Sequence, residues 1–279
     1  MTEKSGRLEI AAKKVVYTLP AMDRVAIRHD VEYGAAGADP LTMDLYYPEK
    51  RSARMAAVVL VCGYPGGGFV KFVGCEFKEM ESCIGWARLI AASGMIAVTY
   101  TNREPVADLE ALLRHVRANA ALLEIDETRI GLWAASGNVP LALRALMQSR
   151  HELLRCAVLC YGYMLDLDAS TGVADAAATF RFVDAAAGAS VDDLPRDMPL
   201  FVARAGRDEM PRLNEGLDRF VAHALARNLP ISLVNHPTGA HAFDLHDDSQ
   251  TTRNVIEQIL AFLRGRLLNR WAANASVPD

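Results

Sequence analysis

The chain has 279 residues, of which 51% are hydrophobic and 23% charged, and its formal net charge is −4 at pH 7. A chain of this length buries about three quarters of its unfolded surface, so disorder, fibres and small disulfide scaffolds are excluded. Its longest apolar run, Met55 to Cys62, is far shorter than the ~20 residues of a membrane-spanning helix. The slightly acidic balance, with Lys and Arg scattered along the chain, gives no footprint for nucleic acid or an anionic membrane.

Two further features bear on location and redox state. The first ten residues carry charges but lack the apolar stretch of a secretory signal, which predicts a cytoplasmic protein. The five cysteines are odd in number and form no CxxC pair. This argues against a disulfide framework and against a structural zinc site, so we expect reduced thiols that lie mostly in the core.

The hydrophobic pattern changes along the chain. Residues 14–50 alternate polar and apolar positions around Gly34, Gly37 and Asp39-Pro40, which predicts an antiparallel hairpin. From residue 56 onwards, short apolar runs alternate with helical periods, the pattern of a mostly parallel α/β sheet whose strands are covered on both faces. The predicted strands are Ala56–Cys62, Met95–Tyr100, Arg129–Trp133, Cys156–Tyr161, Leu200–Arg204 and Ile231–Asn235.

Helices are predicted between these strands. Apolar residues recur at helical spacing after Pro105, after Pro211 and over residues 255–263, and each proline stands where a first helical turn accepts it. Residues 162–198, rich in Ala and Asp, fit neither pattern and are predicted to form helices that cap one end of the sheet. Because no long linker interrupts the chain, residues 1–279 are predicted to form a single domain with a lid insertion at 162–198.

Ser136 stands where a strand gives way to a helix that is predicted to run from Gly137 to Met147. This is the layout of a nucleophile elbow, a sharp turn that exposes a serine above the sheet. The N–H of Gly137, at the helix N-terminus, can stabilise an oxyanion. Ala134 and Asn138 replace the glycines of the usual G-x-S-x-G pattern, and asparagine tolerates a positive φ better than most residues. A serine in an ordinary strand-to-helix loop is the alternative.

An acid follows the next strand but one. Asp208 lies in a tight loop after the strand Leu200–Arg204, and Glu209 is the alternative acid. With Ser136 before it and a histidine after it, Asp208 would complete the chain order Ser, Asp, His. Each residue would lie beyond the carboxyl end of a parallel strand, where ligands bind in open α/β sheets.

The histidine is predicted to be His241, which follows the last strand and has a flexible approach through Gly239 and Ala240. His236, at the end of that strand, and His246, further along, are the alternatives. The chemistry would then assign nucleophilic attack to the serine, proton transfer to His241 and orientation of the imidazole to the acid. Asp244 is assigned to capping the final helix.

A glycine-rich loop, Val61–Gly68, follows the first core strand. Glycines let backbone N–H groups approach a developing oxyanion with no Cβ in the way. No Gly-Lys-Ser/Thr follows, so the loop is not a phosphate-binding loop. A plain glycine-rich turn is the alternative. The backbone N–H groups of Tyr64 and Gly137 are the predicted oxyanion donors.

In order and spacing, these segments resemble the α/β-hydrolase fold, and more narrowly the dienelactone-hydrolase-type esterases. The resemblance covers about residues 40–268 and is strongest at 129–147 and 200–244. It implies a mostly parallel eight-stranded sheet with flanking helices, and hydrolysis of a small-molecule carboxylic ester through an acyl-enzyme, with no metal and no cofactor. Dienelactone hydrolases proper have a cysteine at the elbow, so Ser136 points to a general esterase. Cys62 stands where many relatives carry a histidine.

Several side chains are predicted to wall the substrate pocket. Arg103, just after the strand Met95–Tyr100, would receive a substrate carboxylate, and an exposed, solvated arginine in a strand-to-helix loop is the alternative. The same fold also supports a non-catalytic ligand-binding protein, and the same three residues also serve thioesterases, C–C bond hydrolases and peptidases. The amino-terminal hairpin offers a surface for a homodimer. The other predicted wall residues are Tyr64 and Phe69 from the glycine-rich loop and Tyr163, Met164, Phe180 and Phe182 from the lid.

Overall fold

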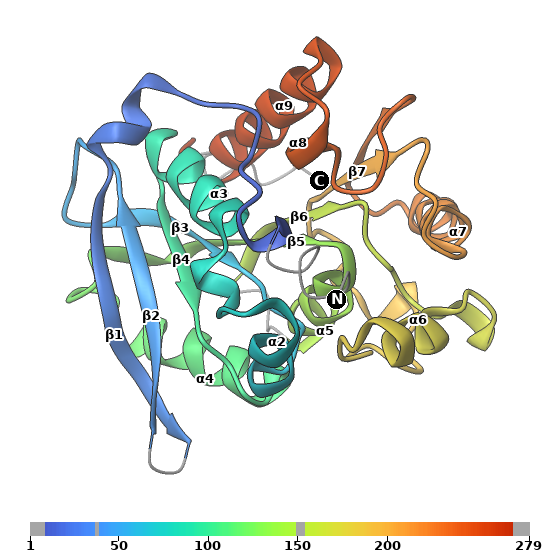
Figure 1. Ribbon diagram of the computed structural model, residues 1–279, viewed down its shortest axis with the longest axis horizontal. Helices are drawn as coiled ribbons and strands as arrows, with labels where there is room; N and C mark the ends of the chain where they lie inside the picture. The colour runs from blue at the N-terminus through green and yellow to red at the C-terminus, as the bar shows by residue number, and fades with distance from the viewer. Residues whose placement is uncertain (1–8, 37–38, 149–153, 270–279) are drawn as a thin grey trace, which may run out of the picture.

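A sheet of eight strands runs through the computed structural model, which describes residues 9–36, 39–148 and 154–269 (Figure 1). The strand order is β1-β2-β4-β3-β5-β6-β7-β8. β2 pairs antiparallel with β1 and β4, and all other neighbours pair in parallel, so the predicted mostly parallel sheet is confirmed. The strands are β1 (Ala26–Ala36), β2 (Asp39–Tyr47), β3 (Met55–Leu60), β4 (Ile96–Tyr100), β5 (Ile125–Ala135), β6 (Leu154–Cys160), β7 (Leu200–Ala205) and β8 (Ile231–His236).

Helices cover both faces of this sheet. In Figure 1, α3 (Glu81–Ala92) and α9 (Gln250–Leu267) lie on one side, and α4 (Pro105–Ala118) and α5 (Val139–Gln148) lie on the other, where α7 (Leu213–Ala226) also packs. None of the described helices is long and apolar enough to span a bilayer. Three shorter helices complete the described part: α2 (Gly66–Val73), α6 (Val173–Phe180) and α8 (Phe243–His246).

The central strands supply both hydrophobic cores. Every residue of β3 is buried, and its side chains alternate between the faces, as the pleat requires. Ala57 and Val59 join the core under α4, α5 and α7, whereas Val58 and Leu60 join the core under α3 and α9. This is why the central strands are almost continuously apolar. β8 lies at the edge of the sheet and is largely exposed, so the prediction that its segment is covered on both faces is wrong.

The predicted hairpin is formed by β1 and β2. Gly34 lies inside β1 opposite Leu41 rather than in a turn, and Gly37 is outside the described residues. The buried ammonium group of Lys78 ties the hairpin to the body of the protein, because it donates to Asp30 Oδ1 at 2.6 Å and to Asp44 Oδ1 at 2.9 Å. The use of this hairpin in a homodimer stays a prediction.

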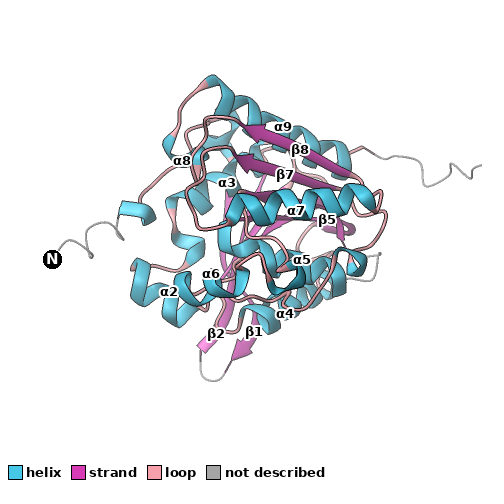
Figure 2. Ribbon diagram, turned by 90° about the vertical axis from the view of Figure 1, so that its right-hand side faces the viewer, coloured by secondary structure: helices cyan, strands magenta, loops and turns pink. Residues whose placement is uncertain are grey.

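The parallel strands direct their following loops to one edge of the sheet. Figure 2 shows the arrows of β7 and β8 pointing the same way, towards the end of the sheet where α8 lies. The loops after β3, β5, β7 and β8 therefore meet at this edge, the usual ligand-binding position in open α/β sheets. These are the loops that contain the candidate site residues.

Candidate active site

Ser136 occupies a strained turn between β5 and α5. Its φ is +57°, in the left-handed region, and a single 3-10 turn, Ser136–Asn138, separates the strand from α5, which begins at Val139 rather than at Gly137. A Cβ on Gly137 would lie 2.5 Å from a ring carbon of Phe182 and 2.6 Å from the hydroxyl of Tyr64. The turn therefore requires glycine after the serine.

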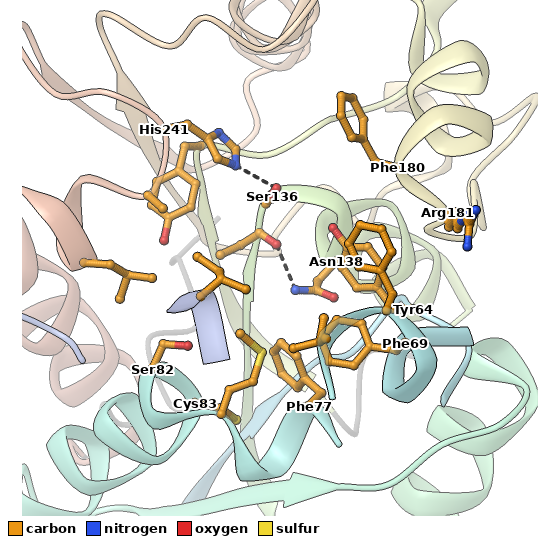
Figure 3. Close-up of a pocket in the computed structure, with 18 of the residues that line it drawn as sticks. Tyr64, Phe69, Phe77, Ser82, Cys83, Ser136, Asn138, Phe180, Arg181 and His241 are labelled. Atoms are coloured by element: carbon orange, nitrogen blue, oxygen red, sulfur yellow. Dashed lines mark hydrogen bonds between the residues drawn. The ribbon is translucent and has the colours of Figure 1, made fainter. Parts of the chain in front are cut away.

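A chain of hydrogen bonds joins the three residues from separate loops. Ser136 Oγ lies 2.9 Å from His241 Nε2, as Figure 3 shows, and His241 Nδ1 lies 2.7 Å from Asp208 Oδ2. The side chain of Asp208 is fully buried, and its Oδ1 accepts the N–H of Met210 at 2.9 Å. The carboxylate thus has a fixed orientation, with one oxygen facing the imidazole.

The loops that supply the acid and the histidine are bonded to each other. Gly206 N–H donates to His236 O and Arg207 N–H donates to Gly239 O, both at 2.8 Å. Of the alternative residues, Glu209 and His246 are exposed. The third alternative, His236, is fully buried, and its Nε2 lies 2.9 Å from Thr252 Oγ1. The hydrogen-bonded chain to Ser136 thus runs through Asp208 and His241.

The loop after β3 is held against the turn at Ser136 by side chains and by the segment between β6 and β7. Asn102 Nδ2 donates to Cys62 O at 2.9 Å, and Gly63 N–H donates to Asn138 Oδ1 at 2.8 Å. From the segment between β6 and β7, Val183 N–H donates to Gly63 O at 2.9 Å. The backbone of the loop after β3 is therefore fixed before any substrate binds. The role of the segment between β6 and β7 as a lid stays a prediction.

The contacts of the Asn138 side chain explain why this position holds asparagine rather than the glycine of the usual pattern. Positive φ is not the reason, because the positive-φ residue of this turn is Ser136. The side chain instead joins the elbow to the loop: its Oδ1 accepts Gly63 N–H, and its Nδ2 donates to Ala135 O at 2.9 Å (Figure 3). A glycine at this position would leave both backbone groups without these partners.

Asn138→Ala should therefore loosen the loop. We expect kcat for an ester to fall about tenfold and the melting temperature to decrease, because the variant leaves a buried N–H unsatisfied at a cost of about 1–3 kcal/mol. Steady-state kinetics and thermal unfolding measure the two effects. A melting temperature equal to that of the wild type would contradict the stabilising role of the two Asn138 hydrogen bonds.

The hydroxyl of Tyr64 lies beside Ser136 and Gly137, so this residue brings a side-chain donor to the site as well as a backbone N–H. Burial raises its pKa to about 12, and hydrogen bonding to Ser136 and to the N–H of Gly137 opposes this rise. The phenol therefore stays protonated at neutral pH and is a donor beside the nucleophile. Its position just after Gly63, in the loop that follows β3, was the available signal. The predicted donor role of the Tyr64 backbone N–H stays a prediction.

The thiol of Cys62, next to this loop, is a poorly reactive one. Cys62 is buried, and burial raises its pKa to about 12, so the thiol is protonated at neutral pH and is a poor nucleophile. Its Sγ lies 3.7 Å from Tyr64 O. All five cysteines are free thiols, and of these only Cys75 is not buried.

Ser136 and His241 open into a cavity of about 420 Å³ with largely aromatic walls (Figure 3). Trp86 of α3 and Trp133 of β5 also line the cavity. The sequence did not predict them as lining residues, because the direction of their side chains depends on how α3 packs on the sheet. The aromatic side chains that line the cavity are Tyr64, Phe69, Phe72, Phe77, Trp86, Trp133, Tyr161 and Phe180.

The structure places three of the seven predicted wall residues in the lining of this cavity: Tyr64, Phe69 and Phe180. Arg103, Tyr163, Met164 and Phe182 are not among its lining residues. Tyr163 is turned away, because its ring stacks on Phe182 at 5.4 Å and its hydroxyl donates to a backbone carbonyl. Arg103 lies at the start of α4, where its backbone N–H donates to an aspartate carboxylate, and it is not among the residues that line this cavity.

Comparison with solved structures identifies the fold. No protein-family model matches the chain, and no curated protein matches it in sequence. A bacterial heroin esterase matches with a TM-score of 0.68 and 16% identity over 95% of this chain and 90% of that one. The esterase LipW from Mycobacterium marinum matches at 0.67 and 16%, over 96% and 88%. Thermogutta terrifontis esterase 2 phosphonylated by sarin matches at 0.64 and 17%, over 88% and 96%.

These similarities and the sheet order show that the chain has the α/β-hydrolase fold, as its sequence predicted. The solved structures named above are those of esterases. The narrower likeness to dienelactone hydrolases stays a prediction from the sequence.

Proposed function

We propose that this protein is a serine hydrolase that cleaves a small carboxylic ester through an acyl-enzyme. The observation that carries the proposal is the hydrogen-bonded chain Ser136–His241–Asp208, whose serine and histidine line the aromatic cavity. A nucleophile, a base within hydrogen-bonding distance and a buried carboxylate that orients the base are the parts that acyl transfer needs.

The reaction would proceed in two halves. Ser136 Oγ attacks the ester carbonyl as its proton passes to His241 Nε2, and Asp208 stabilises the imidazolium through Nδ1. His241 then protonates the departing alcohol and leaves an acyl-serine. In the second half, a water molecule loses a proton to His241 as it attacks the acyl carbonyl. His241 then returns this proton to Ser136 Oγ, and the acyl group departs as the carboxylic acid. The hydroxyl of Tyr64 would donate to the oxyanion in both halves, and the N–H of Gly137, which bonds the Tyr64 oxygen in the free protein, would exchange that partner for the oxyanion.

The cavity indicates the kind of ester. Its volume of about 420 Å³ and its mainly apolar, aromatic lining suit an uncharged ester with a compact hydrophobic group. The fold neighbours support an esterase: one is named a heroin esterase, and in another the enzyme is phosphonylated by sarin. The name of the heroin esterase does not identify the substrate of this chain.

A fluorophosphonate probe tests the proposal directly. We expect one phosphonyl adduct per chain, located on Ser136 by peptide mass mapping, together with hydrolysis of p-nitrophenyl esters from acetate to octanoate. Thioester and peptide substrates tested in parallel separate the related enzyme classes. Labelling of a different residue would refute the assignment of the nucleophile. A protein that binds esters without turning over any activated ester would instead be a binding protein.

Tyr64→Phe tests the oxyanion donor. The variant keeps the ring and loses the hydroxyl, so we expect kcat to fall roughly 10²-fold, as for loss of one oxyanion-hole donor, with little change in KM. Steady-state kinetics of ester hydrolysis measure both kcat and KM. Phe69→Leu is the control for altered aromatic packing, because Phe69 contacts Tyr64 but bears no donor. Equal losses of kcat in the two variants would contradict the donor role.

A further inference from the structure

A second carboxylate lies close to the site and takes no part in the mechanism above. Asp244 is 2% exposed and lines the cavity. Its Oδ2 accepts Trp86 Nε1–H at 2.7 Å, and its Oδ1 accepts the hydroxyl of Tyr161 at 2.6 Å. It does not cap the final helix as expected, because Ser249 Oγ accepts the N–H of Thr252 there. Asp244 is therefore a buried acid whose partners come from α3 and from the end of β6.

Tyr161 connects this carboxylate to the imidazole. It follows β6 with a φ of +34°, a strained value for a residue with a large side chain, and such strain is found where the surroundings fix a conformation for function. Its ring lies edge-on to the ring of His241, with centroids 5.2 Å apart and an interplanar angle of 69°. Asp244 therefore holds the hydroxyl end of a ring that packs on the imidazole.

The charges around His241 are few. Besides His241 itself, the basic side chain among the described lining residues is Arg181, which is exposed. Burial raises the pKa of Asp244, and hydrogen bonds from Tyr161 and Trp86 and the nearby imidazole lower it. A buried carboxylate is costly unless a positive charge is near, and an imidazolium on His241 would supply one. The other titratable groups near the pair are Ser136, Asp208, Tyr161, Cys83 and Cys160.

We propose that Asp244 is a positioning residue for His241, which holds the imidazole against Ser136 through Tyr161 and stabilises the positive charge that forms on it during catalysis. This inference rests on the proposed function, because the imidazolium arises in that reaction. Asp208 contacts the imidazole directly, whereas Asp244 acts through an aromatic ring and through space.

The test is the pH profile of Asp244→Asn, which removes the charge and keeps the size. We expect kcat to fall about tenfold with KM for a neutral ester unchanged, and the acidic limb of the kcat/KM profile to move about one pH unit lower. The sign follows because loss of a nearby negative charge makes the imidazolium less stable, so the histidine deprotonates at lower pH. An unmoved acidic limb would overturn the electrostatic part of the proposal.

Two further variants separate this role from simple folding. Asp108→Asn is a matched control: Asp108 of α4 is also a buried carboxylate, and it accepts the N–H groups of Arg103 and Glu104, which precede the helix. It should lower the melting temperature and leave the acidic limb in place. Tyr161→Phe keeps the ring and loses the bond to Asp244, so kcat should fall several-fold. An unchanged kcat in Tyr161→Phe would overturn the link even if Asp244→Asn failed to fold.

A direct titration makes the inference independent of turnover. The imidazole of His241 can be followed by NMR in the wild type and in Asp244→Asn, without substrate. A lower pKa of His241 in the variant supports the proposal, and an equal pKa overturns it. If the wild type hydrolyses no ester, the proposed function fails, and this titration still decides whether Asp244 acts on His241.

Discussion

Replacing Ser136 with alanine is expected to lower kcat for an activated ester by roughly 10⁴-fold or more while the fold is retained. The Oγ atom that would form the acyl-enzyme is lost, and only substrate binding and the donors at Gly137 and Tyr64 remain to stabilise the transition state. Alanine fits the turn because it removes a single oxygen. The measurement is p-nitrophenyl acetate hydrolysis, with circular dichroism and thermal unfolding as the check on folding.

The matched control is Ser93→Ala at the end of α3, where the serine hydroxyl donates to Leu89 O at 2.8 Å. This variant should keep wild-type turnover. Because Ser136 and His241 act as a unit, the double variant Ser136→Ala/His241→Ala should be no slower than either single variant. A Ser136→Ala protein that retains a tenth of the wild-type kcat would show that the nucleophile lies elsewhere.

The sequence predicted those elements whose signal is local. The six parallel-sheet strands were predicted because each contains a short apolar run, and β3 is buried on both faces as such a run requires. β8 has such a run but lies at the exposed edge of the sheet. β5 proved longer than predicted: the run Arg129–Trp133 is its apolar centre, and the strand starts at Ile125 with polar residues and a register shift in its pairing with β3. The polar residues at the start of β5 are therefore the reason why the apolar pattern did not predict that part of the strand.

The parts that could not be predicted depend on contacts between distant residues. The bond from Gly63 to Asn138 spans 75 positions, and the bond from Trp86 to Asp244 spans 158. Neither leaves a periodic or motif-like trace in the sequence. From the sequence alone, Asn138 is therefore only a departure from the elbow pattern, and Asp244 is only a helix cap. The packing of α3 and of the loop after β3 gives both side chains their actual contacts.

The predicted role of Arg103 also depended on contacts between distant residues, because these decide where the cavity lies. An arginine after a strand at the ligand-binding edge was a reasonable carboxylate receiver, but the cavity lies between α2, α3 and the end of α6 rather than at the start of α4. Which side of the serine a pocket opens on depends on the bulk of neighbouring side chains. The lining that results is mainly apolar and includes eight aromatic side chains, and this is why we favour uncharged esters.

Asp208→Asn is expected to reduce kcat by roughly 10³–10⁴-fold at neutral pH, although the substitution is nearly isosteric. The reason is the fixed N–H of Met210, which donates to Asp208 Oδ1 at 2.9 Å. An asparagine amide must keep its oxygen there, so its NH₂ group faces His241 Nδ1 in place of Oδ2. The imidazole must then accept at Nδ1 and carry its proton on Nε2, where it cannot take the proton of Ser136.

Glu209→Gln provides the comparison, because Glu209 is exposed and was the alternative acid in the sequence. It should keep wild-type kcat. The tautomer argument also predicts that Asp208→Asn and Asp208→Ala differ in kind: alanine leaves Nδ1 without a partner and both tautomers accessible, whereas asparagine enforces the unproductive one. Asp208→Ala should therefore retain the higher kcat of the two. If asparagine were instead the milder substitution, the carboxylate would be stabilising charge on the imidazolium without selecting its tautomer.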